Sequence, residues 1–361
     1  MVVEIGSEIR IRDTSKELYD WAQENLIIPN PQYRERERRG LWVGNTPKYL
    51  WLYHVDGSDL IVPTGVGKQV RQFLSEKDQI SIHLADNGIL DYKGTIPLYD
   101  YQKEAVETMG HASCGILQSP CGSGKTQMGI ALAAMLGRKV LWVTHTQDLL
   151  IQSKTRAEQY FSPETLGTIT AGKAQVGSHM TFATVQTLCR IDLGQFRYTW
   201  DVVIVDECHR LAGSPTQVTM FYKVMNSLAA RHKYGLSATV HRSDGMIKST
   251  FAVLGPVIYK VPDEAVADKT MQVRILQRNT GITVSRSCLD TDGTLDYNGL
   301  LSYLGENRER NEMIVKDLVS QKGHSCLILA SRLEQLRNIR DLLPDELRGT
   351  SAMIDGGMTS K

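Results

Sequence analysis

Two stretches of the sequence could cradle the phosphates of a nucleotide, because each places glycines and a lysine between an apolar run and a helical pattern. They are VPTGVGK at residues 62–68 and SPCGSGKT at residues 119–126. In a phosphate-binding loop the glycines let the phosphates approach backbone N–H groups. The lysine reaches the β and γ phosphates, and the hydroxyl of the next residue binds Mg²⁺. The first stretch has Gln69 in place of that hydroxyl, which favours a structural turn. The second has Ser119 where a first glycine is usual but supplies the rest, so we expect nucleotide at Gly122, Ser123, Gly124, Lys125 and Thr126.

An acidic pair ends the continuous apolar run in VVIVDECH. Residues 202–205 are all β-branched, which is typical of a central strand buried on both sides. An acid at the carboxyl end of such a strand emerges at the ligand crevice. We expect Asp206 and Thr126 to hold Mg²⁺ and Glu207 to polarise the water that attacks the γ-phosphate, with Lys125 completing the catalytic set. A helix cap would explain an Asp-Glu pair alone, but not one that follows this strand downstream of GSGKT.

Length and composition place few limits on what the chain binds. The chain has 361 residues, of which 42% are hydrophobic, enough for two or three domains with buried cores. The 41 basic residues nearly balance the 40 acidic ones, so any surface for nucleic acid must be a local patch. No apolar run of membrane-spanning length and no signal-peptide pattern is present, so we expect a soluble, cytoplasmic protein of a bacterium or phage-infected cell. The six cysteines lack zinc-site spacing, which predicts free thiols.

The chain divides into three regions by pattern. Residues 1–95 carry short alternating apolar runs, which predict a small sheet-rich α+β domain. Residues 96–262 alternate helical and strand patterns, which indicates an α/β domain with a parallel sheet covered by helices on both faces. Residues 263–361 combine helical stretches with predicted strands at MQVRILQ, SCLILA and TSAMID. The acidic loop around Asp290 and Asp292 resembles part of a calcium loop but lacks its bidentate glutamate, so a glycine-containing turn is the better interpretation.

The motifs together resemble a known family. GSGKT, DECH and LSATVHRSDGM (236–246) look like motifs I, II and III of superfamily 2 helicases, and are most similar to the XPB-like and phage UvsW-like DEAD/DEAH group. The resemblance implies a RecA-like P-loop fold with a complete first domain, 96–262, and a partial second one, 263–361. LYDYQKEAV (98–106) resembles the adenine-recognition segment, which implies that Gln102 reads the base, with Tyr99 in place of a common arginine. Residues that would couple the nucleotide to the domain interface are His209, Ser237, Thr239 and Arg242.

Further segments resemble the nucleic-acid-binding motifs of the same group. VTHTQDLLIQ (143–152), TFATVQTL (181–188) and CLILASRLEQL (326–336) look like motifs Ia, Ib and IV. They imply strand contacts at Thr146, Thr184, Gln186, Ser331 and Arg332, although helix capping or turn formation is an alternative for the residues of motifs Ia and Ib. Residues 28–53 are similar to the group's N-terminal DNA-binding module. The run Arg34–Arg39 within them is either a self-paired solvated face or, with the neighbouring Tyr33 and Trp42, a nucleic-acid contact.

The resemblance implies an ATP-dependent DNA helicase or translocase that uses Mg²⁺, moves 3′ to 5′, and acts on single-stranded, forked or branched DNA. Two alternatives stay open: an RNA helicase of the same superfamily, and a nucleic-acid-binding ATPase-like module without motor activity. The second alternative arises because nothing resembles the QxxGRxxR segment that supplies an arginine finger. Either the chain is a fragment of a longer helicase, or it ends here and turns over feebly.

Overall fold

The computed structural model describes residues 1–170, 172–240, 244–267, 274–290, 293–321 and 323–356. Contacts divide the chain into two compact units, Met1–Gln272 and Val273–Lys361. The predicted regions 1–95 and 96–262 both lie in the first unit, so the boundary between them stays a prediction. Among the described helices, none has the length and apolar character that a membrane crossing requires.

The first unit is built on an eight-stranded sheet in the order β11-β10-β12-β9-β13-β14-β8-β15. Every neighbouring pair is parallel except β10 and β11, which confirms the predicted parallel sheet. The strands are β8 Cys114–Gln118, β9 Val140–Thr144, β10 Leu166–Thr170, β11 Lys173–Gln175, β12 Met180–Thr184, β13 Val202–Asp206, β14 His232–Ser237 and β15 Val257–Lys260. All five residues of β9, β12 and β13 are buried, because helices cover both faces.

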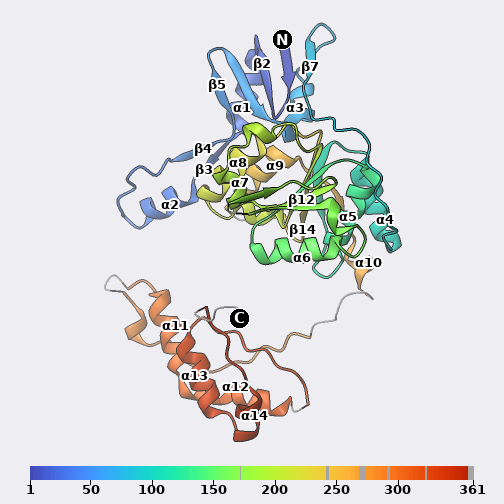
Figure 1. Cartoon of the computed structure of the whole chain (residues 1–361). Helices are drawn as coiled ribbons and strands as arrows, with labels where there is room; N and C mark the ends of the chain where they lie inside the picture. Colours follow the sequence, from blue (N-terminus) through green and yellow to red (C-terminus); the bar gives the residue numbers. More distant parts are fainter. Residues whose placement is uncertain (171, 241–243, 268–273, 291–292, 322, 357–361) are drawn as a thin grey trace. The chain divides into compact units, whose positions relative to one another are not determined.

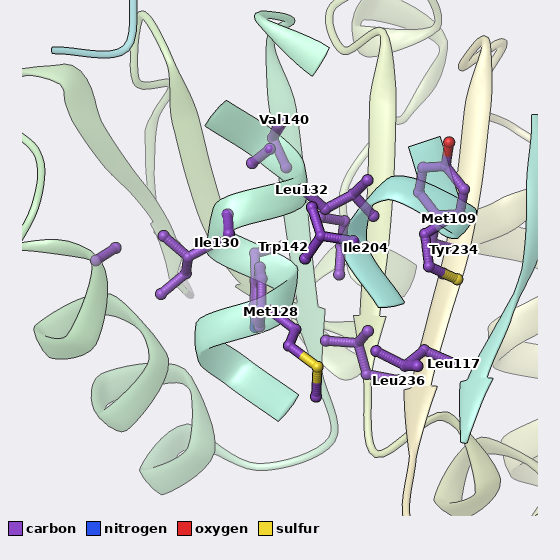
Figure 2. Packing of buried hydrophobic residues seen from close by; sticks show 14 of the residues in the cluster. Met109, Leu117, Met128, Ile130, Leu132, Val140, Trp142, Ile204, Tyr234 and Leu236 are labelled. Carbon is purple, nitrogen blue, oxygen red and sulfur yellow. The ribbon is translucent and has the colours of Figure 1, made fainter. Parts of the chain in front are cut away.

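Alternate residues of each strand point into two separate hydrophobic clusters. Trp142 and Ile204 belong to the cluster that also includes residues of α4, α5 and α6, part of which Figure 2 shows. Leu141 and Val203 belong to the cluster on the other face, with residues of α7, α8 and α9. The helices of this part are α4 Asp100–Gly110, α5 Lys125–Leu136, α6 Gln147–Ala157, α7 Val185–Arg190, α8 Pro215–Met225, α9 Ile247–Leu254 and α10 Asp263–Val266. Short 3-10 turns are η2 Pro163–Thr165, η3 Gly194–Phe196 and η4 Cys208–Ala212.

The N-terminal region forms the α+β arrangement that its short apolar runs predict. Its five-stranded sheet has the order β5-β6-β2-β1-β7, in which only β1 and β7 pair in parallel. These strands are β1 Val2–Ile5, β2 Glu8–Arg12, β5 His54–Asp56, β6 Asp59–Pro63 and β7 Gln79–Ile82. A separate antiparallel pair, β3 Ile27–Pro29 and β4 Tyr49–Trp51, carries α2 Pro31–Arg38 between its strands, while α1 Lys16–Asn25, η1 Thr64–Val66 and α3 Gly67–Arg71 complete the region.

A buried lysine joins the N-terminal sheet to the large one. Lys233 on β14 is only 2% exposed, and its Nζ donates hydrogen bonds to the carbonyl oxygens of Ser7 and Met225, each at 3.0 Å. Burial lowers the pKa of Lys233 to about 8. Because Ser7 lies between β1 and β2, this side chain fixes the turn of the N-terminal sheet against the central strands.

The second unit consists mainly of helices, and the predicted strands of this region are wrong where they are described. Its elements are η5 Arg286–Cys288, α11 Tyr297–Glu306, α12 Arg308–Ser320, α13 Leu333–Leu342 and α14 Asp345–Thr350. The described residues of MQVRILQ, SCLILA and TSAMID form no strand, and Leu327 and Leu329 are 84% and 85% exposed. A strand requires a neighbour for its backbone hydrogen bonds. Within the described part of this unit, bridge pairing is limited to Leu289 with Leu295.

The stretch VPTGVGK forms a structural turn, as its sequence predicts. The turn packs against the end of α9 and is not an open loop. It runs from the end of β6 through η1 into α3. A Cβ on Gly65 would lie 2.5 Å from the backbone nitrogen of Gly255 and 2.6 Å from the carbonyl oxygen of Ala252. The glycine therefore allows close contact with the end of α9. By contrast, a Cβ on Gly67 would make an ordinary contact of 3.5 Å with Ile9 Cδ1.

Gly65→Ala should lower the free energy of unfolding by about 2 kcal/mol or more, because the added methyl overlaps backbone atoms that cannot move aside. Gly67→Ala is the matched control two residues away, and it should leave stability nearly unchanged. Urea denaturation followed by circular dichroism measures both variants. Equal stability of the two would contradict the packing role of the turn.

Candidate functional site

The predicted nucleotide residues meet at the carboxyl ends of three neighbouring strands. In the register of the sheet, Asp206 of β13 is opposite Leu236 of β14, and Ser237 of β14 is opposite Gln118 of β8. The loop that contains residues 119–124 follows β8, so it begins beside the acidic end of β13. As a result, Lys125 Nζ lies 3.7 Å from Glu207 Oε1, and the structure brings the predicted lysine and acidic pair together.

The loop is shaped by glycines and held by serines. Gly122 and Gly124 have φ angles of 79° and 83°, a left-handed conformation that favours glycine. Gly124 precedes α5, so the loop leads directly into the N-terminus of that helix. The buried hydroxyls of Ser119 and Ser123 are hydrogen-bonded to each other, and Ser123 Oγ also donates to the carbonyl oxygen of Pro120 at 2.6 Å. Ser119 thus stabilises the loop at the position where the usual pattern has glycine.

Two cavities adjoin the loop. One, of about 330 Å³, is lined by Lys125, Thr126, Asp206 and Glu207, the residues predicted to bind phosphate and Mg²⁺. The other, of about 500 Å³, is lined by the segment Pro97–Gln102 except Asp100. Residues common to both are Gly122, Gly124, Gln127 and Arg156. The sequence interpretation missed Gln127 and Arg156, because neither belongs to a recognisable motif.

Gln102 connects the predicted adenine segment to the loop. Its side chain is 4% exposed; Nε2 donates to the carbonyl oxygen of Ser123 at 2.8 Å, and Oε1 accepts from the backbone N–H of Tyr99 at 2.9 Å. Tyr101 also donates its hydroxyl to the carbonyl oxygen of Ser123, at 2.9 Å. The rings of Tyr99 and Tyr101 stack with centroids 5.9 Å apart. These contacts position the segment beside the loop, and recognition of a base by Gln102 stays a prediction.

Asp206 is buried, and its neighbour Glu207 has a constrained backbone conformation. Burial, and then the neighbouring Glu207 carboxylate, raise the pKa of Asp206 from 3.8 to about 6. Asp206 accepts a hydrogen bond from the Glu207 backbone N–H at 2.9 Å and from the Ser153 hydroxyl at 3.4 Å. Glu207 itself has a φ of 48°, a left-handed conformation that is strained for a residue with a side chain. Desolvation and backbone strain at adjacent residues are typical of a functional site.

Asp206 and Glu207 suit Mg²⁺, which phosphates and waters also ligate, better than a metal ion that is held by protein side chains alone. The described residues contain no group of three or more His, Cys, Asp or Glu side chains able to hold a metal. Mg²⁺ commonly uses one or two carboxylates together with substrate phosphates and waters. Burial and the neighbouring Glu207 carboxylate disfavour the charged form of Asp206, so a cation bound beside it would stabilise that form.

A chain of short contacts runs from Glu207 to the end of β14. His209 Nδ1 lies 3.3 Å from Glu207 Oε2 and 2.9 Å from Ser237 Oγ. Ser237 Oγ in turn accepts a hydrogen bond from the Thr239 backbone N–H at 3.1 Å. The contacts required for the predicted bridge by His209 are therefore present, while its coupling role stays a prediction. Arg242, predicted to act with these residues, lies outside the described part of the chain.

Two of the three residues predicted to bind a nucleic-acid strand in motifs Ia and Ib, Thr146 and Thr184, cap helices. Thr146 Oγ1 accepts from the backbone N–H of Leu149 at 3.4 Å, and Thr184 Oγ1 accepts from that of Thr187 at 3.2 Å. The capping alternative thus describes both threonines, and phosphate contact stays a prediction. Gln186 does reach a polar cluster, with its Nε2 3.4 Å from His145 Nδ1. The sequence interpretation missed another member of this cluster, Gln217 of α8, whose Nε2 is 3.4 Å from His145 Nε2.

The two remaining predicted contacts lie in the second unit. Ser331 is exposed. Arg332 is the N-cap residue before α13, and its Nη2 donates to Asn298 Oδ1 of α11 at 2.9 Å. Its guanidinium therefore helps to join two helices of the unit, and its proposed contact with nucleic acid stays a prediction.

Comparisons with known proteins match the part of the chain that contains this candidate site. A family model described as "Type III restriction enzyme, res subunit" matches residues 95–242. The chain is similar to the DNA 3'-5' translocase XPB2 of Sulfurisphaera tokodaii, with 30% identity over 213 residues that cover 56% of this chain and 45% of the relative. It is also similar to the DNA 3'-5' helicase XPB of Mycobacterium tuberculosis, with 28% identity over 174 residues that cover 46% and 30%. The chain thus spans less than half the length of these two curated relatives.

A solved structure supports the fold. The UvsW helicase from Bacteriophage T4 superimposes with a TM-score of 0.52 and 19% sequence identity, covering 72% of this chain and all of that one. At this identity the likeness concerns the fold alone. Together with the parallel sheet, it confirms the α/β, RecA-like P-loop architecture expected from the sequence.

Asp206→Asn should stabilise the protein at pH 8. A raised pKa means that the folded state favours the protonated carboxyl, so this contribution to stability is present below pH 3.8 and lost as pH rises through about 6. At pH 8 the penalty is about 2 to 3 kcal/mol, which the neutral amide avoids. The free energy of unfolding from urea titrations at pH 8 and pH 4 should show a larger gain at pH 8. A gain independent of pH would contradict the burial argument.

Proposed function

We propose that this chain is a superfamily 2 helicase of the XPB-like and UvsW-like type, which hydrolyses ATP with Mg²⁺ and uses the reaction to move on or remodel DNA. The observation that carries the proposal is the convergence of Lys125, Thr126, Asp206 and Glu207 around one cavity. The Lys125 ammonium and the Asp-Glu pair come from segments about 80 residues apart in sequence, and each provides a group that phosphoryl transfer to water requires.

Each residue has a role that follows from its place. Lys125 and the backbone N–H groups at the start of α5 would bind the β and γ phosphates. Thr126 and Asp206 would hold Mg²⁺, which neutralises phosphate charge when it is bound. Glu207, 3.7 Å from Lys125 and 3.3 Å from His209, would orient the attacking water through its carboxylate. Tyr99 would offer its exposed ring as a stacking surface for the base.

DNA is the proposed polymer, with movement from 3′ to 5′ and branched or forked DNA as the preferred form. Support for DNA and for the direction comes from the names of the two relatives, which describe a DNA 3'-5' translocase and a DNA 3'-5' helicase. Thr146 and Gln186 lie just after the carboxyl ends of β9 and β12, and Thr184 is the last residue of β12. At these strand ends short polar groups can meet phosphates without reading sequence. The preference for branched or forked DNA rests only on the resemblance to this group.

Lys125→Ala should abolish Mg²⁺-dependent ATP hydrolysis, because the phosphates then lose their main cationic contact. Lys68→Ala, in the turn with a packing role, is the matched control and should retain turnover. Phosphate release is measured without nucleic acid and with single-stranded DNA, forked DNA or RNA of equal length.

The polymer arms of this assay separate the alternatives. Stimulation by DNA but not RNA supports a DNA motor, and the reverse supports an RNA helicase. Nucleotide binding with negligible turnover in every arm would contradict the proposed activity of this chain. Loss of turnover in both lysine variants would contradict the assignment of the loop.

Arg156→Ala should raise the KM for ATP about tenfold, the usual effect of losing one charge-assisted hydrogen bond. Arg156 lines both cavities, and its Nη1 donates a hydrogen bond to the neutral amide oxygen Oε1 of Gln159 at 3.1 Å, which leaves its charge available to a phosphate. Lys154→Ala is the control on the same helix, since Lys154 pairs with Glu158 instead. An unchanged KM in Arg156→Ala would show that this side chain does not contact the nucleotide.

A further inference from the structure

A cavity of about 310 Å³ lies between the N-terminal sheet and the large sheet of the first unit. The large sheet lines it with residues at or just before the starts of β8 and β14, which are Ser113, Cys114, Ala230, Arg231 and Lys233. The candidate nucleotide site is at the carboxyl ends of these same strands. The cavity is therefore at the opposite edge of the large sheet, and the proposed hydrolysis does not use it.

The N-terminal sheet contributes an apolar wall that is only partly covered. In the pairing of β7 with β1, Ile80 is opposite Val3 and Ile82 is opposite Ile5. Because residues two apart in a strand point to the same face, these four side chains share one face of the sheet. All four line the cavity, yet Ile80 and Ile82 are 43% and 62% exposed. Contiguous exposed apolar side chains are typical of an interaction surface.

The strand that carries the two exposed isoleucines is at the edge of its sheet (Figure 1). Among the described strands, only β1 pairs with β7. The backbone N–H groups of Gln79 and His83 donate toward β1, at 3.2 and 2.7 Å. Successive residues of a strand alternate in the direction of these groups, so the N–H and carbonyl groups of Ile80 and Ile82 point away from β1. They are in place to pair with one more strand.

The charge around the cavity has one sign. Lys68, Arg71, Arg231 and Lys233 line it, and none of its described lining residues is Asp or Glu. Lys233 donates to carbonyl oxygens, and Arg231 pairs with Asp86 at 3.3 Å. Lys68 and Arg71 are exposed on α3 and make no ion pair with the residues that the structure describes. The surface therefore complements a partner that combines apolar side chains with negative charge.

An extended acidic peptide fits these features better than nucleic acid or a second copy of the chain. The described lining residues include no aromatic ring on which a base could stack. Backbone donors and acceptors at a strand edge match another peptide backbone. Two copies joined through β7 would bring Lys68 and Arg71 of both copies toward one edge, which like-charge repulsion disfavours.

We propose that β7 binds an extended acidic segment of a partner protein as an additional strand of the N-terminal sheet. Alternate apolar side chains of the segment would cover Ile80 and Ile82, and an acidic side chain would reach Lys68 and Arg71. Main-chain hydrogen bonds would supply affinity, while the cavity and its cations would supply specificity. This surface goes beyond ATP hydrolysis and does not depend on it.

The test measures binding of the full chain to labelled nine-residue peptides by fluorescence anisotropy. The reference peptide alternates valine with threonine and has glutamate at both ends, and a matched peptide has lysine there instead. The glutamate peptide should bind about tenfold tighter than the lysine peptide. Two further peptides are N-methylated at every second backbone nitrogen, in the two possible phases. Binding should be lost in the one phase whose nitrogens face β7.

Variants of the chain separate the apolar and the charged contributions. Ile80→Thr/Ile82→Thr should weaken binding of the glutamate peptide about tenfold, because apolar surface is removed while β propensity is kept. Lys68→Gln/Arg71→Gln should weaken it about fivefold and should not weaken the lysine peptide. Val55→Thr is the matched control on β5, the other edge strand of the same sheet, and should have no effect. DNA-independent ATP hydrolysis and thermal unfolding should be unchanged in all variants.

Hydrogen exchange provides a second readout on the unaltered chain. Saturation with the glutamate peptide should slow exchange of the Ile80 and Ile82 amides at least about tenfold, because these N–H groups gain acceptors. Amides of β5 should keep their rates. Mass spectrometry with fragmentation to single residues measures both.

The proposal is overturned by affinities for the glutamate and lysine peptides within about twofold, by binding that survives N-methylation in both phases, or by unchanged exchange at Ile80 and Ile82. No binding of the glutamate peptide at about 1 mM, a level that detects even a weak complex, would also overturn it. A dimer in sedimentation velocity that Ile80→Thr/Ile82→Thr dissociates would assign the surface to a second copy instead. Binding of 15-nucleotide oligo(dT) that the same variant abolishes would assign it to nucleic acid.

Discussion

The structure depends on parallel pairing among four strands that are almost wholly buried, β9, β13, β14 and β8. A strand covered on both faces has no place for a polar side chain except at its ends. Since parallel strands end at the same edge, polar groups from three separate segments are forced together there. The glycine loop after β8, the acidic pair after β13 and Ser237 at the end of β14 meet for this reason. The candidate site is thus a consequence of the sheet.

The burial that stabilises the sheet also makes the candidate site unfavourable for the free energy of folding. Asp206 keeps a carboxylate in a region where its pKa rises to about 6, and Glu207 adopts a left-handed backbone conformation. Both features work against folding, and neither is needed to complete the sheet. Positions that violate local preferences are expected where function is selected over stability. The same carboxylates would be stabilised by a bound cation, so ligand binding would offset part of the cost.

Sequence signals were reliable where they were local. The apolar run at 202–205 and the loop at Gly122–Thr126 are recognisable from a few consecutive residues. The structure has a buried strand at the first and a loop that leads into a helix at the second. Arg156 and Ser153 reach the site from α6 and carry no pattern of their own, so only the folded sheet reveals them. The strand predicted at SCLILA shows the opposite limit. Its residues have strand propensity, but a strand exists only with a partner, and pairing is a non-local property.

Lys233 makes the N-terminal sheet part of the same rigid arrangement. A buried ammonium is tolerated only when its hydrogen bonds are satisfied, and the carbonyl oxygens of Ser7 and Met225 supply two of them. Asn226, directly after α8, makes another hydrogen bond to the N-terminal sheet, because its Nδ2 donates to Oε1 of Glu8 in β2 at 3.0 Å. Because Lys233 and Ser237 lie on one strand, the N-terminal sheet is anchored to the strand that ends beside the candidate site.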